Sequence, residues 1–287
     1  MRNSSGSRPA RFFRKKTGAA SHSTPGGRTC GQIILSTDNV NKRRRAGVSA
    51  TGKIIFTGAA GLLGSEFKKR RPDLDYPAEK DFDITDYRQM EDYVSKGDYR
   101  GIFHAAAFTS PPKIDADPGK ALQVNIIGTA NVTALAMAHS LRLFYMSTDY
   151  VFRGDRGNYT EEDALYPVNK YAWSKLGGEC AVRLYDDSLV IRTTFGPVPF
   201  PYDKAFIDQW TSRESVTTIV DMIAPLLDTD VRGVIHVGGK RKTVFEYAAA
   251  LDNERTIAPL SIHDVPFTVP ADTSLDCSKY RTLMDRN

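Results

Sequence analysis

The feature that most constrains the fold is an alternation of short apolar runs with longer amphipathic stretches, which starts at residue 53. Apolar runs of strand length occupy residues 53–57, 101–104, 143–147, 189–192 and 233–237. Helical patterns lie between them, at 62–70, 86–96, 118–139, 167–185 and 214–227. Because neighbouring parallel strands need a crossover that is usually a helix, this alternation predicts a parallel sheet with helices on both faces. The expected fold is therefore α/β, with a doubly wound sheet of the Rossmann type.

Charge divides the chain near residue 52. Residues 1–52 hold eleven of the 39 Lys and Arg residues and one acid, which leaves 28 basic and 33 acidic residues in 53–287. The first 52 residues carry one short apolar stretch, so we expect a basic, disordered leader. An organellar transit peptide, a nuclear or nucleic-acid-binding patch, and a start site placed too far upstream are alternative interpretations. After it we expect a Rossmann domain at 53–195 and a smaller substrate-binding part at 196–287, whose returning strand at about 233–237 joins the sheet.

Composition excludes several classes of protein. The apolar runs are shorter than the roughly 20 residues of a membrane span, so no membrane partner is expected. The acidic balance of 53–287 argues against a nucleic-acid partner. Three widely spaced cysteines support neither a disulfide framework nor a zinc site, and five histidines show no metal-binding spacing. We therefore expect no metal and a cytoplasmic location, with organellar targeting by the leader as an alternative.

A glycine-rich turn follows the first apolar run. Residues 57–64 read TGAAGLLG, with Gly58, Gly61 and Gly64 at intervals of three before a helical stretch. Glycines let the backbone approach a pyrophosphate, and the N-terminus of the helix offers free N–H groups to it. A strand before and a helix after this turn favour a dinucleotide site over a plain tight turn.

The choice between NAD and NADP stays open at this point. An acid after the second strand would bind a ribose hydroxyl, whereas an arginine would favour a 2′-phosphate. Asp73 and Asp75 supply the first signal, and the basic run at 68–71 supplies the second. A solvated helix end is an equally good interpretation of that run.

A tyrosine and a lysine four residues apart indicate proton donation to a carbonyl. Tyrosine can donate a proton if a nearby cation lowers its pKa, and a lysine at i+4 lies on the same helical face. Three YxxxK patterns occur, but prolines interrupt Tyr76/Lys80 and Tyr166/Lys170, which leaves Tyr171/Lys175 within an expected helix. We further expect Thr148, where the apolar run at 143–147 ends, to hold the substrate carbonyl. A strand-end turn is the alternative for Thr148.

Four segments together resemble the extended short-chain dehydrogenase/reductase superfamily, and most of all its dTDP-4-dehydrorhamnose reductase family. These segments are TGAAGLLG at 57–64, HAAAFTS at 104–110, STDYVF at 147–152 and YAWSKLGGE at 171–179. The resemblance runs from about residue 53 to residue 279. In the related 4,6-dehydratases a glutamate follows the Thr-Asp pair and acts in elimination. Tyr150 stands at that place here, which implies simple carbonyl reduction.

The resemblance implies a role for each matching residue. Thr148 polarises the keto oxygen, Tyr171 donates the proton, and Lys175 pairs with Tyr171 and with the nicotinamide ribose. Residues implied at the cofactor besides Lys175 are Gly58, Gly61, Leu62, Leu63, Gly64, Asp83, Ile84, Ala105, Ala106, Ala107 and Asn125. Of these, Asp83 and Ile84 lie near the adenine, and Asn125 supports the active-site helix, with a solvent-facing position as its alternative. On the substrate side the resemblance implies Thr109, Asp149 and Tyr150 beside Thr148.

Some positions depart from the family pattern. The glycine that usually follows the catalytic tyrosine is replaced by Ala172, and the arginine often found before the C-terminal proline is absent before Pro270. The sequence has no counterpart to the segment Asp-Gln-x-Gly-x-Pro-Thr, which in the family usually helps to form the substrate side.

These features define three functional hypotheses. The first is NAD(P)H-dependent reduction of the 4-keto group of a nucleotide-activated 6-deoxy sugar, in deoxysugar precursor synthesis. NADP or NAD is the implied cofactor, with NADPH favoured, and the nucleotide sugar is the implied partner of a chain that could form a homodimer. The second hypothesis is an epimerase or epimerase-reductase. The third, of another class, is a non-catalytic NADP-binding regulatory subunit.

Overall fold

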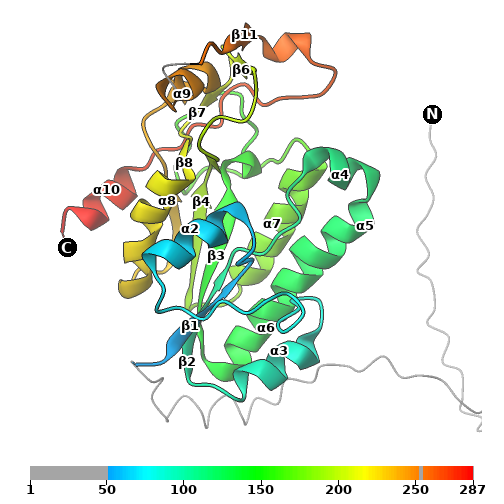
Figure 1. The fold of residues 1–287 in the computed structure, drawn as a ribbon, viewed down its shortest axis with the longest axis vertical. Coiled ribbons are helices and arrows are strands. Elements are labelled where there is room, and N and C mark those ends of the chain that lie inside the picture. The colour runs from blue at the N-terminus through cyan, green and yellow to red at the C-terminus, as the bar shows by residue number, and fades with distance from the viewer. Residues whose placement is uncertain (1–50, 252–254, 287) are drawn as a thin grey trace, which may run out of the picture. The chain divides into compact units, whose positions relative to one another are not determined.

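Five parallel strands form the central sheet of the computed structural model, which describes residues 51–251 and 255–286 (Figure 1). In sheet order they are β1 (Lys53–Thr57), β2 (Tyr99–His104), β3 (Arg142–Thr148), β4 (Ser188–Thr193) and β9 (Gly233–Val237). Each predicted apolar run falls within one of these strands, and residues 233–237 do return to the sheet. The leader expected at 1–52 lies outside the described residues except for its last two.

Helices cover both faces of the sheet, because alternate strand residues point to opposite sides. On one face Phe56 packs in a core with α2 (Leu62–Arg70) and α8 (Val216–Ile223). On the other face Ile55 packs with α3 (Tyr87–Val94) and α6 (Thr129–His139). Figure 1 shows α2 and α8 on one side of the strands, and α3, α6 and α7 (Lys170–Val182) on the other. The expected doubly wound α/β fold is confirmed.

The helical pattern at 118–139 forms one continuous but irregular helix. It consists of α5 (Pro118–Ala121), a π-helical segment η1 (Leu122–Gly128) and α6. By length and composition the whole stretch could cross a membrane, which the sequence analysis did not anticipate, although 44% of its apolar window is buried inside the protein. Val132, Leu135 and Ala136 are fully buried against the sheet. This packing is that of a core helix.

The strand that would precede β2 in a doubly wound sheet is reduced to a single bridge. Asp75 pairs with Ile55: its N–H donates to Ile54 at 2.9 Å, and its carbonyl accepts from Phe56 at 2.7 Å. The Asp75 carboxylate accepts hydrogen bonds from the hydroxyls of Tyr93 (2.8 Å) and Tyr99 (2.6 Å). This predicted ribose-binding acid is therefore engaged by two tyrosines.

After β4 the chain builds a smaller part from three two-stranded pairs and one main helix. The pairs are β5 (Phe195–Gly196) with β8 (Glu214–Ser215), β6 (Lys204–Phe206) with β11 (Ala258–Leu260), and β7 (Trp210–Thr211) with β10 (Lys242–Thr243). Helix α9 (Val244–Leu251) packs on them through Tyr247 and Ala248, in a core separate from those of the sheet. The chain ends in α10 (Ser278–Met284), which contacts β9.

Candidate active site

A cavity of about 1000 Å³ opens at the carboxyl ends of the sheet strands, where ligands of such sheets bind. Its lining comes from the turn after β1, from the ends of β2, β3 and β4, and from the smaller part. Of the residues predicted for the site, it is lined by Gly58, Gly61, Leu62, Leu63, Ala105, Ala107, Thr109, Thr148, Asp149, Tyr150 and Tyr171. Those that do not line it are Gly64, Asp83, Ile84, Ala106, Asn125 and Lys175.

The three glycines of the turn have different structural roles. Gly58 has φ +81°, and a Cβ there would lie 2.8 Å from the Ala106 nitrogen. At Gly64 a Cβ would lie 2.5 Å from the Gly58 oxygen, so this glycine serves the packing of helix α2 on the turn. A Cβ at Gly61 would meet only the Gly58 oxygen at 3.3 Å, and Gly61 begins α2 without a side-chain cap. The cavity thus borders an open helix N-terminus, which suits a pyrophosphate.

A buried histidine, His104, contacts the residues that flank this turn. The Thr57 hydroxyl lies 2.8 Å from His104 Nδ1 and accepts the Ala106 N–H at 3.1 Å, and His104 Nε2 lies 3.0 Å from the Thr129 hydroxyl. Burial, together with the charge of Lys175, lowers the pKa of His104 from 6.5 to about 3. His104 is therefore neutral near pH 7 and has a structural role, because both ring nitrogens are engaged.

The residues predicted near the adenine lie away from the cavity lining. Ile84 is buried against Gly128, where a Cβ would lie 2.8 Å from its Cδ1. The Asp83 carboxylate accepts the Thr85 N–H and hydroxyl at 2.8 Å. The basic run at 68–71 is largely ion-paired, with Arg70 bound to Asp221 and Arg71 to Asp73 and Asp228. These contacts match the interpretation of the run as a solvated helix end.

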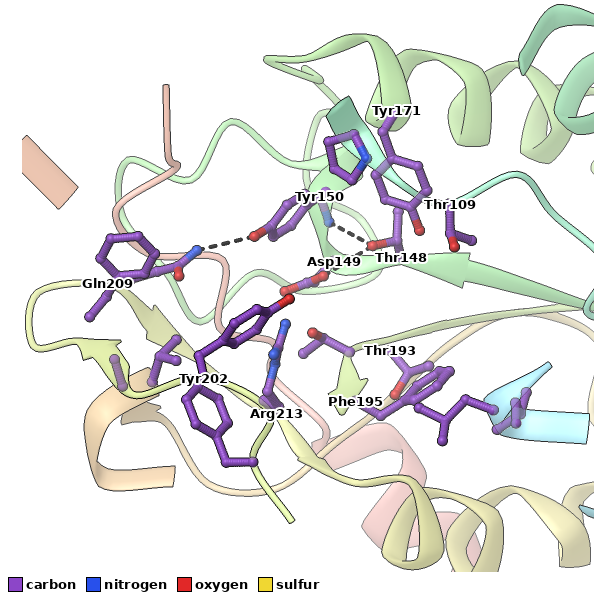
Figure 2. A pocket seen from close by; sticks show the side chains of 18 of the residues that line it. Thr109, Thr148, Asp149, Tyr150, Tyr171, Thr193, Phe195, Tyr202, Gln209 and Arg213 are labelled. Atoms are coloured by element: carbon purple, nitrogen blue, oxygen red, sulfur yellow. Dashed lines mark hydrogen bonds between the residues drawn. The ribbon is translucent and has the colours of Figure 1, made fainter. Parts of the chain in front are cut away.

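Helix α7 (Lys170–Val182) brings Tyr171 to the cavity. It begins three residues later than predicted, because Asn169 caps it by accepting the Ala172 N–H at 2.8 Å. The Tyr171 hydroxyl points toward the Thr148 hydroxyl (Figure 2). Burial raises the pKa of Tyr171 above its ordinary value of 10.0, and the hydrogen bond with Thr148 opposes that rise. Tyr171 is thus a neutral phenol that can donate a proton.

Thr148 is held by its neighbour Asp149. Its hydroxyl donates to the Asp149 carboxylate at 3.1 Å and accepts the Tyr150 N–H at 3.3 Å. The same carboxylate accepts the Thr273 hydroxyl at 2.6 Å. Burial raises the pKa of Asp149 from 3.8 to about 6, although these two hydrogen bonds and the charge of Arg213 act in the opposite direction. To donate to a substrate carbonyl, the Thr148 hydroxyl must turn away from Asp149.

Lys175 lies on the same helical face, but its arrangement differs from the prediction. Its Nζ lies over the Tyr145 ring, 4.2 Å from the ring centre, and its side chain is 4% exposed. Burial lowers the pKa of Lys175 from 10.5 to about 7, against the charge of Glu179. The expected lowering of the Tyr171 pKa by this ammonium is wrong for this structure, because burial outweighs every influence in that direction.

Asn125 lies in the π-helical segment and is 1% exposed, so the solvent-facing alternative is wrong. Its side-chain oxygen accepts the Phe108 N–H at 2.7 Å, and its Nδ2 donates to the Phe108 carbonyl and to the Ser174 hydroxyl, each at 2.8 Å. Asn125 therefore ties the segment after β2 to helix α7. It acts on the site through these contacts rather than from the cavity wall.

Polar residues that the sequence did not predict also line the cavity, among them Thr193, Gln209 and Arg213. Thr193 is the register partner of Thr148 on the next strand. Gln209 Nε2 donates to the Tyr150 hydroxyl at 3.2 Å. Asp208-Gln209 match the first two residues of the segment Asp-Gln-x-Gly-x-Pro-Thr, but its Gly, Pro and Thr positions do not match here. This Asp-Gln pair was the local signal for Gln209.

The part of the chain that the structure describes holds no cluster of three or more His, Cys, Asp or Glu residues suited to a metal ion. The groups that line the cavity are hydroxyls, the carboxyls of Asp149 and Asp203, and the cationic side chains of Lys204 and Arg213, beside a helix N-terminus. This arrangement can hold a phosphate-bearing cofactor at one end and deliver a proton to a carbonyl in the middle.

Comparison with known proteins gives the same family as the sequence motifs. Residues 52–198 match the family described as RmlD substrate binding domain. A relative from Streptomyces niveus, a dTDP-4-keto-6-deoxy-D-glucose reductase, is 30% identical over 65% of this chain and 72% of its own length. The rat protein "Methionine adenosyltransferase 2 subunit beta" is 27% identical over 91% of this chain and 88% of its own length.

Solved structures of related proteins share the fold. A hypothetical dTDP-4-dehydrorhamnose reductase from Sulfolobus tokodaii is 28% identical, with a TM-score of 0.72 over 80% of this chain and 94% of its own. The dTDP-4-dehydrorhamnose reductase from Bacillus anthracis, solved with NADP, is 26% identical, with a TM-score of 0.72 over 81% of this chain and 91% of its own. The predicted family relationship is confirmed.

Proposed function

The chain belongs to the RmlD substrate binding domain family, and we propose that it reduces the 4-keto group of a nucleotide-activated sugar with NADPH or NADH. The observation that carries this proposal is the convergence of the Tyr171 and Thr148 hydroxyls on a cavity that also borders the turn at Gly61. Reductases among the relatives, and the neighbour solved with NADP, support it.

The residues present fit a nicotinamide cofactor. The bare backbone at Gly61 and the uncapped start of α2 would hold its pyrophosphate, and Leu62 and Leu63 border the same space. When bound, the cofactor supplies the hydride that reduces the carbonyl carbon. Tyr171 supplies the proton to the carbonyl oxygen, and it is neutral over the physiological range because burial raises its pKa.

Thr148 acts on the same oxygen, and Asp149 holds the Thr148 hydroxyl until it turns. The Thr148 hydroxyl, once turned toward the substrate, donates a hydrogen bond that strengthens as negative charge grows on the oxygen. Asp149 holds this hydroxyl in the meantime, at 3.1 Å. Tyr150 follows Asp149 where the related dehydratases carry a glutamate, so the site lacks the group that acts in elimination. This difference favours reduction over dehydration.

The test offers the purified chain a panel of dTDP-, UDP- and GDP-4-keto-6-deoxy sugars with NADH or NADPH, and follows nicotinamide absorbance. Tyr171→Phe should lower turnover by about 10²- to 10⁴-fold, the range for loss of a general acid, and leave cofactor affinity unchanged. Tyr166→Phe is the matched control, because Tyr166 is 58% exposed and does not line the cavity. Full activity of Tyr171→Phe would exclude the proposed mechanism.

A second candidate is a cofactor-binding subunit of another enzyme. The observation that favours it is the similarity to "Methionine adenosyltransferase 2 subunit beta", which spans 91% of this chain against 65% for the Streptomyces reductase. If the parent protein binds NADPH tightly but turns over no member of the panel, this candidate replaces the first. If the parent protein turns over a member of the panel and Tyr171→Phe does not, the reductase proposal is supported against the subunit.

A further inference from the structure

Two buried polar atoms, on residues that line the cavity, have no hydrogen-bond partner. Within residues 51–251 and 255–286, the buried side-chain nitrogen and oxygen atoms without a partner are Thr193 Oγ1, Arg213 Nε and Arg142 Nε. The first two belong to residues that line the cavity, whereas Arg142 does not line it. Leaving a buried polar atom unpaired costs roughly 1–3 kcal/mol, so two of them in one wall of the cavity mark a place where the protein alone does not satisfy its polar groups.

These two residues lie next to the proposed reacting groups. Thr193 ends β4, is 2% exposed and pairs in register with Thr148 at the end of β3. Arg213 lies between β7 and β8, and its side chain points into the cavity toward Asp149 and Thr193 (Figure 2). A ligand atom that contacts both residues would therefore sit beside the space between Thr148 and Tyr171.

Arg213 brings a positive charge to this place. Its guanidinium forms no ion pair and no side-chain hydrogen bond with any residue that the structure describes, and its aromatic contact is the Tyr247 ring at 6.0 Å. Its charge helps to lower the pKa of the nearby Asp149, but the Asp149 carboxylate is bound directly by the hydroxyls of Thr148 and Thr273. A partly buried guanidinium without a hydrogen-bonded carboxylate can donate to an anion.

We propose that Thr193 and Arg213 form a subsite that binds an anionic oxygen group of the ligand beside the reacting carbonyl. This inference rests on the proposed function for the kind of ligand, a nucleotide sugar. The anionic group is either the diphosphate that joins nucleotide and sugar or a carboxylate on the sugar ring. Both present the oxygen acceptors that a guanidinium and a hydroxyl recognise together.

The experiment measures the binding of three probes by calorimetry in the presence of saturating NADP⁺. UDP-glucose and dTDP-glucose share the diphosphate and differ in the base, and UDP-glucuronate adds a carboxylate to the sugar of UDP-glucose. The variants are Arg213→Gln, Arg213→Lys and Thr193→Val. Arg241→Gln is the matched control, because it removes an arginine of the same region that pairs with Asp272 and does not line the cavity.

Arg213→Gln should weaken binding by about 10- to 100-fold, as for loss of a charge-assisted hydrogen bond to an anion, and Arg213→Lys should weaken it less. Thr193→Val should weaken it to a smaller degree, and Arg241→Gln should leave it unchanged. An equal loss for all three probes identifies the diphosphate as the ligand group. A loss confined to UDP-glucuronate identifies the sugar carboxylate.

The inference is overturned if the parent protein binds none of the probes, or if Arg213→Gln binds them as tightly as the parent does. The affinity of every variant for NADPH is measured beside these titrations, since it reports that the cofactor end is folded. If the parent protein reduces a 4-keto sugar and Arg213→Gln leaves probe binding unchanged, the subsite is wrong and the reductase proposal stands. If probe binding depends on Arg213 and the parent protein reduces no keto sugar, the subsite stands and the reductase proposal is wrong.

Discussion

The two ends of the cavity are built in different ways. At the cofactor end, backbone atoms of the turn between β1 and α2 form the wall, and the close approach of Gly58 to Ala106 leaves no room for a side chain. At the substrate end, side chains from short strand pairs form the wall, and two of its aromatic residues are largely exposed, Tyr202 at 65% and Phe267 at 61%.

This difference shows which part of the site is free to change. A backbone wall is determined by glycines and by the sheet, so it binds the same chemical group in any chain that keeps the turn. A wall of side chains, such as the one that holds Gln209 and Arg213, changes with every substitution. Cofactor binding is therefore expected to be the conservative property of this molecule and substrate choice the adjustable one.

The largest expected loss of stability comes from breaking the buried ion pair next to the ends of β3 and β4. Glu179 of α7 and Arg192 of β4 form an ion pair at 2.6 Å with both side chains fully buried, and Glu179 also accepts the Ser147 hydroxyl at 2.6 Å. Glu179→Ala leaves the Arg192 charge buried without its partner, so the free energy of unfolding should fall by about 3–5 kcal/mol in denaturant titrations.

The matched control removes an exposed ion pair. Asp221→Ala breaks the contact with Arg70, whose side chain is 48% exposed, and it should cost less than about 1 kcal/mol. If both variants lost the same free energy of unfolding, the buried pair would not stabilise the end of the sheet where Thr148 and Thr193 lie.

The next effect is the pH dependence of stability caused by Lys175. Burial lowers the pKa of Lys175 from 10.5 to about 7, so its contribution to stability is fully present above about pH 10.5 and is lost as the pH falls toward 7. Between pH 10.5 and 7 the free energy of unfolding of the parent should fall by up to about 1.4 kcal/mol for each unit by which the pH is lowered. Lys175→Met should remove that slope in melts compared at several pH values. Identical slopes for both proteins would place the Lys175 ammonium in water.

A smaller effect separates the two roles of glycine in the turn. Gly61→Val places a side chain toward the cavity, so affinity for NADPH should fall on the order of 10-fold or more while the melting temperature stays near that of the parent. Gly64→Val instead drives a side chain into the backbone of Gly58 and Ala59, so stability should fall first. If Gly61→Val bound the cofactor normally, the turn would not belong to the site.

The smallest effect is expected at the rim of the substrate end. Tyr202→Ala removes an exposed side chain that lines the cavity, so stability should change by about 0.5 kcal/mol or less, and KM for the sugar should rise by a few fold. Tyr166→Ala, with 58% exposure and no place in the cavity lining, is the control. A large drop in cofactor affinity for Tyr202→Ala would contradict the division of the cavity into two ends.

Local patterns predicted the strands and the glycine turn accurately, because the periodicity of apolar residues and the spacing of glycines depend on only a few neighbouring residues. The run at 53–57 is β1 as it stands, and 62–70 is α2. Helix α7 was predicted too long at its start, since the choice between Pro167 and Asn169 as its beginning depends on which side chain reaches the Ala172 N–H. The π-helical turn that aims Asn125 at Phe108 and Ser174 has no local signal in the sequence.

The sequence by itself determined the sheet and the glycine turn, and it predicted Tyr171 and Thr148 for the cavity, because each of these depends on neighbours within one turn or strand. Only the tertiary structure decided that Thr193 stands beside Thr148, that Arg213 faces the same cavity, and that Lys175 lies over Tyr145. It also decided the direction of the Tyr171 pKa, since burial depends on the whole fold. These facts join residues far apart in the chain, and no spacing records which distant side chains the packing brings together.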